Sequence, residues 1–98
     1  MYVNIIRSYR DVIAICDSEL IGKRFEQDKL QLDVKENFFK GEEKSSEQVE
    51  EIITQMSAED ATFNIIGKKS INIALKTKLI SQEGIKIING IPFALVLI

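Results

Sequence analysis

Three short stretches of the chain hold the side chains that could do chemistry, and the first is Cys16-Asp17-Ser18. The thiol closes an apolar, β-favouring run, and Asp17 or Ser18 can cap a helix that follows. A helix start offers free N–H groups and a partial positive charge, both of which favour the thiolate. Asp17 opposes that effect with its own charge, and a buried cysteine is most often a small apolar residue. Cys16 is therefore a candidate thiol, with a structural role as the favoured interpretation.

The second stretch, Asn64-Ile65-Ile66-Gly67-Lys68-Lys69-Ser70, has the pattern of a strand, a glycine and a helix start with two lysines. Free N–H groups at a helix start bind phosphate, so a phosphate or a nucleic-acid backbone could dock there. Lys76 joins this set because helical spacing places it on the same face as Lys69. The predicted anion or nucleic-acid site consists of Asn64, Gly67, Lys68, Lys69 and Lys76. The spacing of a P-loop is absent, and a solvated lysine face explains the pattern equally well.

The third stretch is acidic. Glu47, Glu50 and Glu51 fall on the outer side of a predicted helix, and Glu42 and Glu43 precede it. Clustered carboxylates can bind a divalent cation or a basic partner, although a solvated helix face is the simpler interpretation. The spacing of an EF-hand is absent, so we expect no metal site.

The residue types that are missing exclude several classes of function. The chain has no histidine, which removes the commonest general base and the commonest metal ligand. Its one cysteine cannot form an internal disulfide, and no apolar run approaches the roughly 18 residues of a membrane span. We therefore expect a cytoplasmic protein that is not an enzyme and carries no cofactor.

The charges are segregated along the chain. Residues 1–41 balance, residues 42–60 hold one lysine against seven carboxylates, and residues 61–98 hold five lysines against one glutamate. The overall net charge is only −2 because these two parts nearly cancel. The pattern predicts one negative and one positive side of the folded surface.

The first half of the chain predicts a hairpin, a helix and a strand. Residues 2–6 and 12–16 favour β structure and are joined by a polar loop. The second run is apolar on both faces, so it is predicted to be a central strand. Leu20, Ile21 and Phe25 share a face at helical spacing after Asp17 or Ser18, and residues 30–34 alternate like a strand with one wet face.

The second half carries stronger local signals. Ser45 and Gln48 have the form of a capping box before a helix that places Val49, Ile52, Ile53 and Met56 on one side. A strand over residues 61–66 and a helix over residues 68–79 follow. Asn89-Gly90 then stands between two apolar β runs, which predicts a hairpin. The last run, residues 91–98, is apolar at nearly every position and should lie between layers or at an oligomer interface.

These elements predict one α+β domain over residues 1–98, with a mixed sheet, helices packed on it and a C-terminal Asn-Gly hairpin. The order ββαβαβαββ is preferred over ββαβαβββ because residues 68–79 are strongly helical in pattern. Strands that are apolar on both faces require either helices on both faces of the sheet or a dimer.

Three blocks of the sequence resemble an archaeal family catalogued as domain of unknown function 424. They are residues 16–23, residues 64–68, and Asn89-Gly90-Ile91-Pro92-Phe93-Ala94. The resemblance implies an archaeal, cytosolic, single-domain protein, and the place of its relatives among translation genes adds slight support to an RNA-related role. One departure is Phe93, where the family pattern often has histidine after the proline. A catalytic role for that histidine would make this chain inactive.

Two functions follow from these observations. The leading hypothesis is a non-enzymatic, translation-associated binding module for RNA or a ribonucleoprotein that uses the basic last third of the chain. The alternative is a protein-interaction or assembly factor that acts through the acidic helix or the C-terminal strand, with a homodimer as one form. The position of the basic residues discriminates between them. RNA is favoured if Lys68, Lys69, Lys76 and Lys78 converge with Arg7, Arg10, Lys23 or Arg24 on one concave face, and a protein partner if they scatter.

Overall fold

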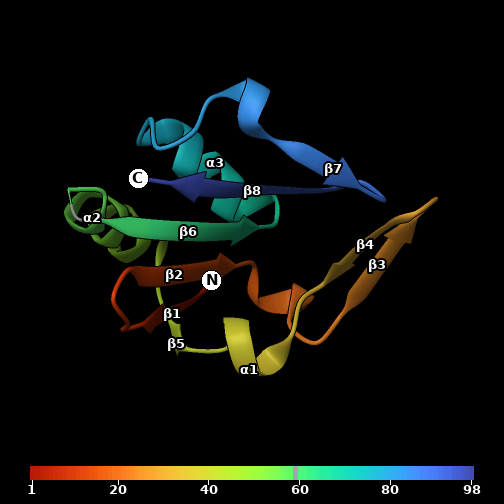
Figure 1. Cartoon of the computed structure of the whole chain (residues 1–98), viewed down its shortest axis with the longest axis horizontal. Helices are drawn as coiled ribbons and strands as arrows, with labels where there is room; N and C mark the ends of the chain where they lie inside the picture. The colour runs from red at the N-terminus through yellow and green to blue at the C-terminus, as the bar shows by residue number, and fades with distance from the viewer. Residues whose placement is uncertain (59) are drawn as a thin grey trace.

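The structure, a computed structural model, describes residues 1–58 and 60–98 and has the predicted α+β class, with a six-stranded mixed sheet (Figure 1). Across the sheet the strands are β5 (Glu42–Glu43), β1 (Tyr2–Ile6), β2 (Asp11–Cys16), β6 (Ala61–Ile66), β8 (Ile91–Leu97) and β7 (Lys86–Ile88). Strands β2 and β6 are parallel, and every other pair in this sheet is antiparallel. None of the described helices is long and apolar enough to cross a membrane.

The central position predicted for residues 12–16 is confirmed. Strand β2 lies between β1 and β6, and Ile13, Ala14, Ile15 and Cys16 are all fully buried. Because side chains alternate along a strand, the two isoleucines face one side of the sheet and Ala14 and Cys16 face the other. The sheet therefore has an apolar core on each face.

Two helices, α2 (Ser46–Met56) and α3 (Lys68–Lys76), cover one face of the sheet. The predicted capping box is present, since Ser45 and Gln48 exchange side-chain-to-backbone hydrogen bonds at the start of α2. Val49 and Ile53 of α2, Phe63 of β6 and Ile71 of α3 are buried together in this core. Helix α3 ends three residues before the predicted position, because Lys78 adopts a positive φ of 62° and Leu79 N–H turns back to Ala74 O.

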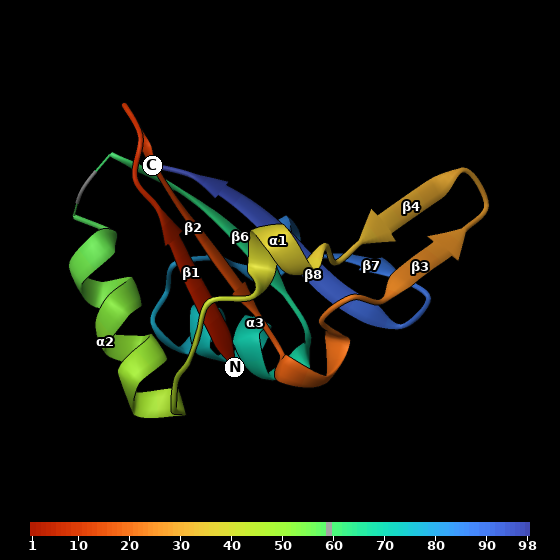
Figure 2. The same cartoon turned by 90° about the horizontal axis from the view of Figure 1, so that it is seen from below.

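Smaller elements cover the opposite face. They are the 3₁₀ turn η1 (Ser18–Leu20), the hairpin of β3 (Arg24–Gln27) and β4 (Leu30–Asp33), and the one-turn helix α1 (Glu36–Phe39). In Figure 2, α1 lies in front of the sheet, α3 lies behind it, and the β3–β4 hairpin projects outward. This cover is incomplete, because Leu95 and Leu97 of β8 remain 61% and 71% exposed.

The helix predicted from Asp17 or Ser18 through Phe25 is wrong. Only the three-residue turn η1 forms, Gly22 then takes a positive φ of 78°, and Phe25 lies in β3 opposite Leu32. Residues 30–34 were predicted to be a strand from their alternation, and Leu32 of that strand is the cross-strand partner of Phe25. This pairing outweighs the helical spacing of Leu20, Ile21 and Phe25. Helix α1 and strand β5 were not predicted.

The C-terminal hairpin is confirmed. Asn89 and Gly90 have positive φ of 52° and 81°, the conformation that a two-residue turn between twisted strands requires. The η2 turn (Gln82–Gly84) precedes this hairpin. The expectation that the last run lies wholly between layers is wrong for Leu95 and Leu97, which face solvent. The other part of that expectation, that residues 91–98 lie at an oligomer interface, remains a prediction.

Candidate functional site

Strand register brings polar and apolar side chains into rows on the face that carries α1. One such row crosses four neighbouring strands. It consists of Asn4 of β1, Ala14 of β2, Asn64 of β6 and Leu95 of β8, each directly opposite the next. Residues directly opposite each other point to the same side of a sheet. Two carboxamides and an exposed leucine therefore share one row, which runs from beneath α1 to the open part of this face.

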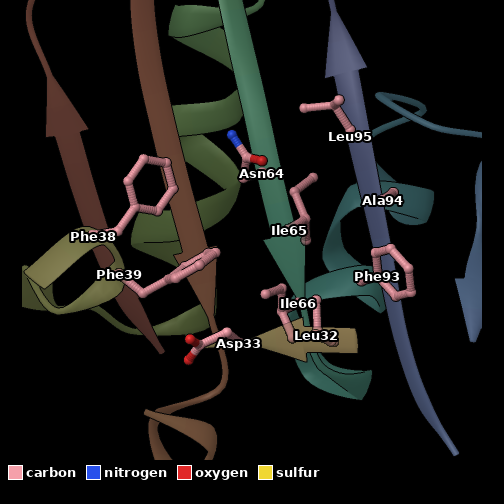
Figure 3. A pocket seen from close by; sticks show the side chains of 10 residues that line it. All are labelled: Leu32, Asp33, Phe38, Phe39, Asn64, Ile65, Ile66, Phe93, Ala94 and Leu95. Atoms are coloured by element: carbon pink, nitrogen blue, oxygen red, sulfur yellow. The ribbon is translucent and has the colours of Figure 1, made fainter. Parts of the chain in front are cut away.

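A groove of about 300 Å³ crosses this face (Figure 3). Its floor comes from β6 and β8, and its sides come from β4 and α1. The lining residues are Leu32, Asp33, Phe38, Phe39, Asn64, Ile65, Ile66, Phe93, Ala94 and Leu95. Eight of these ten are apolar, so the groove suits an apolar group, and its polar chemistry is confined to Asn64 and Asp33.

The α1 wall of the groove is held in place by two contacts. The Asn4 Nδ2 amide donates a hydrogen bond of 2.7 Å to Phe38 O, which ties α1 to strand β1. The rings of Phe38 and Phe39 meet edge to face, with centroids 5.0 Å apart. Phe39 is buried in the core beneath α1, while Phe38 is only partly covered. A four-residue helix is too short to be stable alone, so these contacts keep the wall formed.

Asn64 is the polar group in the floor of the groove. Within residues 1–58 and 60–98, no group forms a hydrogen bond with its carboxamide. A carboxamide offers two N–H donors and a carbonyl acceptor, so this side chain presents both kinds of hydrogen-bonding partner to an occupant. Asn64 was predicted to belong to an anion site beside Gly67, but its side chain points to the opposite face of the sheet from α3.

The start of α3, where an outside anion was predicted to bind, is filled by a carboxylate of the chain itself. Asp17 is only 4% exposed, and its two oxygens accept hydrogen bonds from Lys69 N at 3.1 Å, Ser70 N at 2.9 Å and Ser70 Oγ at 2.8 Å. Gly67 makes room for it, since a Cβ at that position would lie 2.6 Å from both carboxylate oxygens. Two of the backbone N–H groups that would attract an outside anion are thus already bonded to Asp17.

The structure does not bring the five predicted site residues together. Gly67, Lys68 and Lys69 lie at the start of α3, and Asn64 lies in the groove on the other face. Lys76 is at the far end of α3, where its Nζ is 3.2 Å from Glu50 Oε2 of α2. Lys68 borders a separate hollow of about 310 Å³ with Asn72 and Ile87.

The other basic residues also scatter. Arg24 lies in the β3–β4 hairpin on the face opposite α3, where its Nε is 3.3 Å from Glu26 Oε1. Arg7 lies in the β1–β2 loop and pairs with Asp11 at 2.8 Å. No concave face therefore collects the lysines of α3 together with these arginines among the residues that the structure describes.

Cys16 has the surroundings of a structural thiol. It is fully buried between Ala14, Val34 and Ile66 in the core under α1. Burial, together with the adjacent charge of Asp17, raises the pKa of this thiol from 9.0 to about 12. The protonated form is therefore favoured, which is the opposite of what a reactive cysteine requires.

The acidic residues do not form one site. Glu50 pairs with Lys76, Glu42 pairs with Lys44, and Glu43 accepts a hydrogen bond of 2.6 Å from Ser18 Oγ. No group of three or more potential metal ligands converges in the described part of the chain. The outer side of α2 is thus a charged helix face with one inter-helix ion pair.

The comparisons with known proteins address the fold. A family described as "Protein of unknown function (DUF424)" matches residues 6–98. The chain belongs to the DUF424 family. The resemblance drawn from the three sequence blocks is confirmed at the level of the family, and Phe93 of the third block lines the groove. No curated protein matches this DUF424 chain.

One solved structure is similar over nearly the whole chain. It is the crystal structure of an uncharacterized conserved protein from Methanopyrus kandleri, which is 20% identical with a TM-score of 0.77. The match covers 98% of this chain and 90% of the other. At this level of identity the likeness establishes the shared fold and leaves the activity to be argued from the site.

Proposed function

We propose that this protein is a non-enzymatic protein-interaction module, acting in the cytoplasm, whose groove holds an apolar side chain of a partner protein. The observation that carries the proposal is the carboxamide of Asn64 in the floor of an otherwise apolar groove, with no hydrogen-bond partner within the described residues. A partner side chain that is apolar over most of its surface and has one N–H or O–H group would satisfy both features. Tryptophan and tyrosine have this character.

The lining supports a binding role. Ligand sites are typically apolar and aromatic, with a few placed polar groups that fix orientation. Phe38, Phe39 and Phe93 supply the aromatic surface, and Asn64 supplies the polar group. Aromatic anchors in well-packed pockets contribute most of the free energy at many protein interfaces.

The charges favour a protein over RNA as the partner. RNA binding depends largely on phosphate contacts from clustered lysines and arginines. Here the lysines of α3 and Arg24 lie on opposite faces of the sheet, and the acidic residue Asp33 borders the groove itself. A nucleobase would also fit aromatic walls and a carboxamide, so RNA is the competing outcome of the test below.

The test is a nuclear magnetic resonance titration of the whole protein with small probes. N-acetyl-tryptophanamide should shift the side-chain amide of Asn64 and the backbone amides of Phe93 and Leu95 in a saturable way. N-acetyl-leucinamide, which has no side-chain donor, should bind more weakly. Asn64→Leu should weaken tryptophanamide binding about fivefold, the worth of roughly one hydrogen bond. Asn72→Leu, on the exposed side of α3, is the matched control and should leave binding unchanged.

Two results would overturn this proposal. The first is the absence of saturable shifts around the groove. The second is tighter binding of a short oligoadenylate than of tryptophanamide at the same residues, with a steep loss of affinity as salt rises. That second result would support the RNA hypothesis.

A further inference from the structure

Half of the outer edge of β8 has no partner strand. Strand β8 pairs with β6 from Phe93 to Leu97, but the shorter β7 pairs with it only from Ile91 to Phe93. In Figure 1, β8 continues well beyond the start of β7. Within the described residues, no backbone group outside β6 forms a hydrogen bond with residues 94–97.

The direction of the free backbone groups follows from two hydrogen bonds. Ile98 N–H donates to Ala61 O, and Pro92 O accepts from Gly67 N–H, so the even-numbered residues of β8 point toward β6. Backbone groups alternate in direction along a strand. The N–H and C=O groups of Leu95 and Leu97 therefore point outward, as two donors and two acceptors on an open edge.

The side chains at this edge are apolar and exposed. Leu95 and Leu97 are 61% and 71% exposed on the open face of the sheet, and residues 94–97 contain no charged residue and no proline. Proteins normally protect a free edge with charge, proline, a bulge or a covering element, because an unprotected edge pairs with other strands. Residues 94–97 lack two of these devices, charge and proline, and no described strand pairs with their outer side.

We infer that a second copy of this chain covers the edge, with the two β8 strands antiparallel about a two-fold axis at Val96. In this register Leu95 of each copy lies opposite Leu97 of the other. Both leucines have outward backbone groups, so the two pairs would form four hydrogen bonds between the copies. The same residues serve on both sides, which is the requirement for a closed two-fold dimer.

The register also keeps the contact within the free stretch. With Val96 on the axis, Leu95 and Leu97 pair between the copies, and both lie beyond Phe93, where the pairing of β8 with β7 ends. The two leucine pairs would cover the exposed apolar patch, and no like charges meet because residues 94–98 are uncharged.

Leu95 belongs to both the groove and this edge, but Leu97 does not line the groove, so variants at Leu97 test this inference separately from the proposed function. Sedimentation equilibrium of the whole protein up to about 500 μM should show a reversible monomer–dimer system, since a short edge contact is a weak interface. Leu97→Lys should weaken dimerisation at least tenfold. Leu97→Pro should do the same by removing one outward N–H, a change that an edge position tolerates.

The matched control is Leu30→Lys. Leu30 lies in the β3–β4 hairpin, away from the free edge of β8, and is 57% exposed. The control therefore makes the same leucine-to-lysine change as Leu97→Lys at a side chain that is also mostly exposed. It should leave dimerisation unchanged. Backbone amide exchange at Leu95 and Leu97 should also slow as protein concentration rises. A monomer throughout this range, or a dimer unaffected by both Leu97 variants, would overturn the inference.

Discussion

The carboxylate of Asp17 and the hydroxyl of Ser70 are 2.8 Å apart although 53 residues separate them in the chain. Asp17 follows the last residue of β2, and Ser70 lies in the first turn of α3, which follows β6. Because β2 and β6 are parallel and in register, the ends of both strands lie side by side. The contact thus links the centre of the sheet to the start of α3.

Asp17→Asn should destabilise the protein by about 1–3 kcal/mol, because the amide replaces one of the oxygens that accept hydrogen bonds at the start of α3. Urea denaturation followed by circular dichroism measures this change. Asp28→Asn is the matched control, since Asp28 has a positive φ of 56° in an exposed turn that asparagine tolerates well. Equal effects of the two substitutions would contradict a structural role for Asp17.

Gly67→Ala should lower the free energy of unfolding more than an ordinary glycine-to-alanine substitution does. The added Cβ would meet the Asp17 carboxylate, and the φ of 111° is unfavourable for any residue with a side chain. The expected loss is about 2 kcal/mol or more from strain and the displaced carboxylate together. Gly84→Ala provides the comparison, because nothing lies within 4 Å of its Cβ position. A Gly67→Ala variant as stable as Gly84→Ala would refute the close contact.

Cys16 should resist alkylation in the native protein. Iodoacetamide near neutral pH should label it only in denaturant, since the thiol is fully buried and mostly protonated. Rapid labelling of the native protein would show that Cys16 is accessible and would revive the reactive-thiol interpretation.

The raised pKa of Cys16 also predicts an alkaline effect on stability. In the folded state the thiol keeps its proton up to about pH 12, whereas its ordinary pKa is 9.0. The unfolded chain therefore loses this proton first, and the free energy of unfolding should fall as pH rises from about 9 to about 12. Below pH 9 this group should contribute no pH dependence. The measurement is the difference between wild type and Cys16→Ala across this range, which should shrink as pH rises.

The features that sequence alone predicted correctly are those encoded within a few residues. Ser45 and Gln48 are three residues apart, and their capping box consists only of hydrogen bonds between these two residues. Asn89 and Gly90 likewise specify a turn by their own tolerance of positive φ. Helix α1 was missed because four residues are too few to show a helical period.

The site depended on contacts that are distant in sequence. Asn64 was selected as a neighbour of Gly67, but period-2 alternation places it with Thr62, opposite in direction to Phe63 and Ile65. This alternation alone could have predicted that Asn64 faces away from α3. The occupation of the α3 start by Asp17 required the parallel pairing of β2 with β6, which no local pattern encodes.

Asn4→Ala tests whether the groove wall depends on its tie to β1. The substitution removes the 2.7 Å hydrogen bond from Asn4 Nδ2 to Phe38 O and should lower stability by about 1 kcal/mol. Because α1 has only one turn, its own hydrogen bonds should open more often. The amides of Phe39 and Lys40, which donate to Lys35 O and Glu36 O, should then exchange faster with solvent.

The amide exchange pattern makes this prediction specific. Amides of β2 and β6 should keep their protection in Asn4→Ala, since the central strands do not depend on α1 for their pairing. A matched asparagine-to-alanine change at the exposed Asn72 should leave α1 exchange at the wild-type rate. Tryptophanamide binding should weaken in Asn4→Ala but not in Asn72→Ala, because only the first loosens the wall that carries Phe38. An unchanged affinity with faster α1 exchange would show that the wall does not contribute to binding.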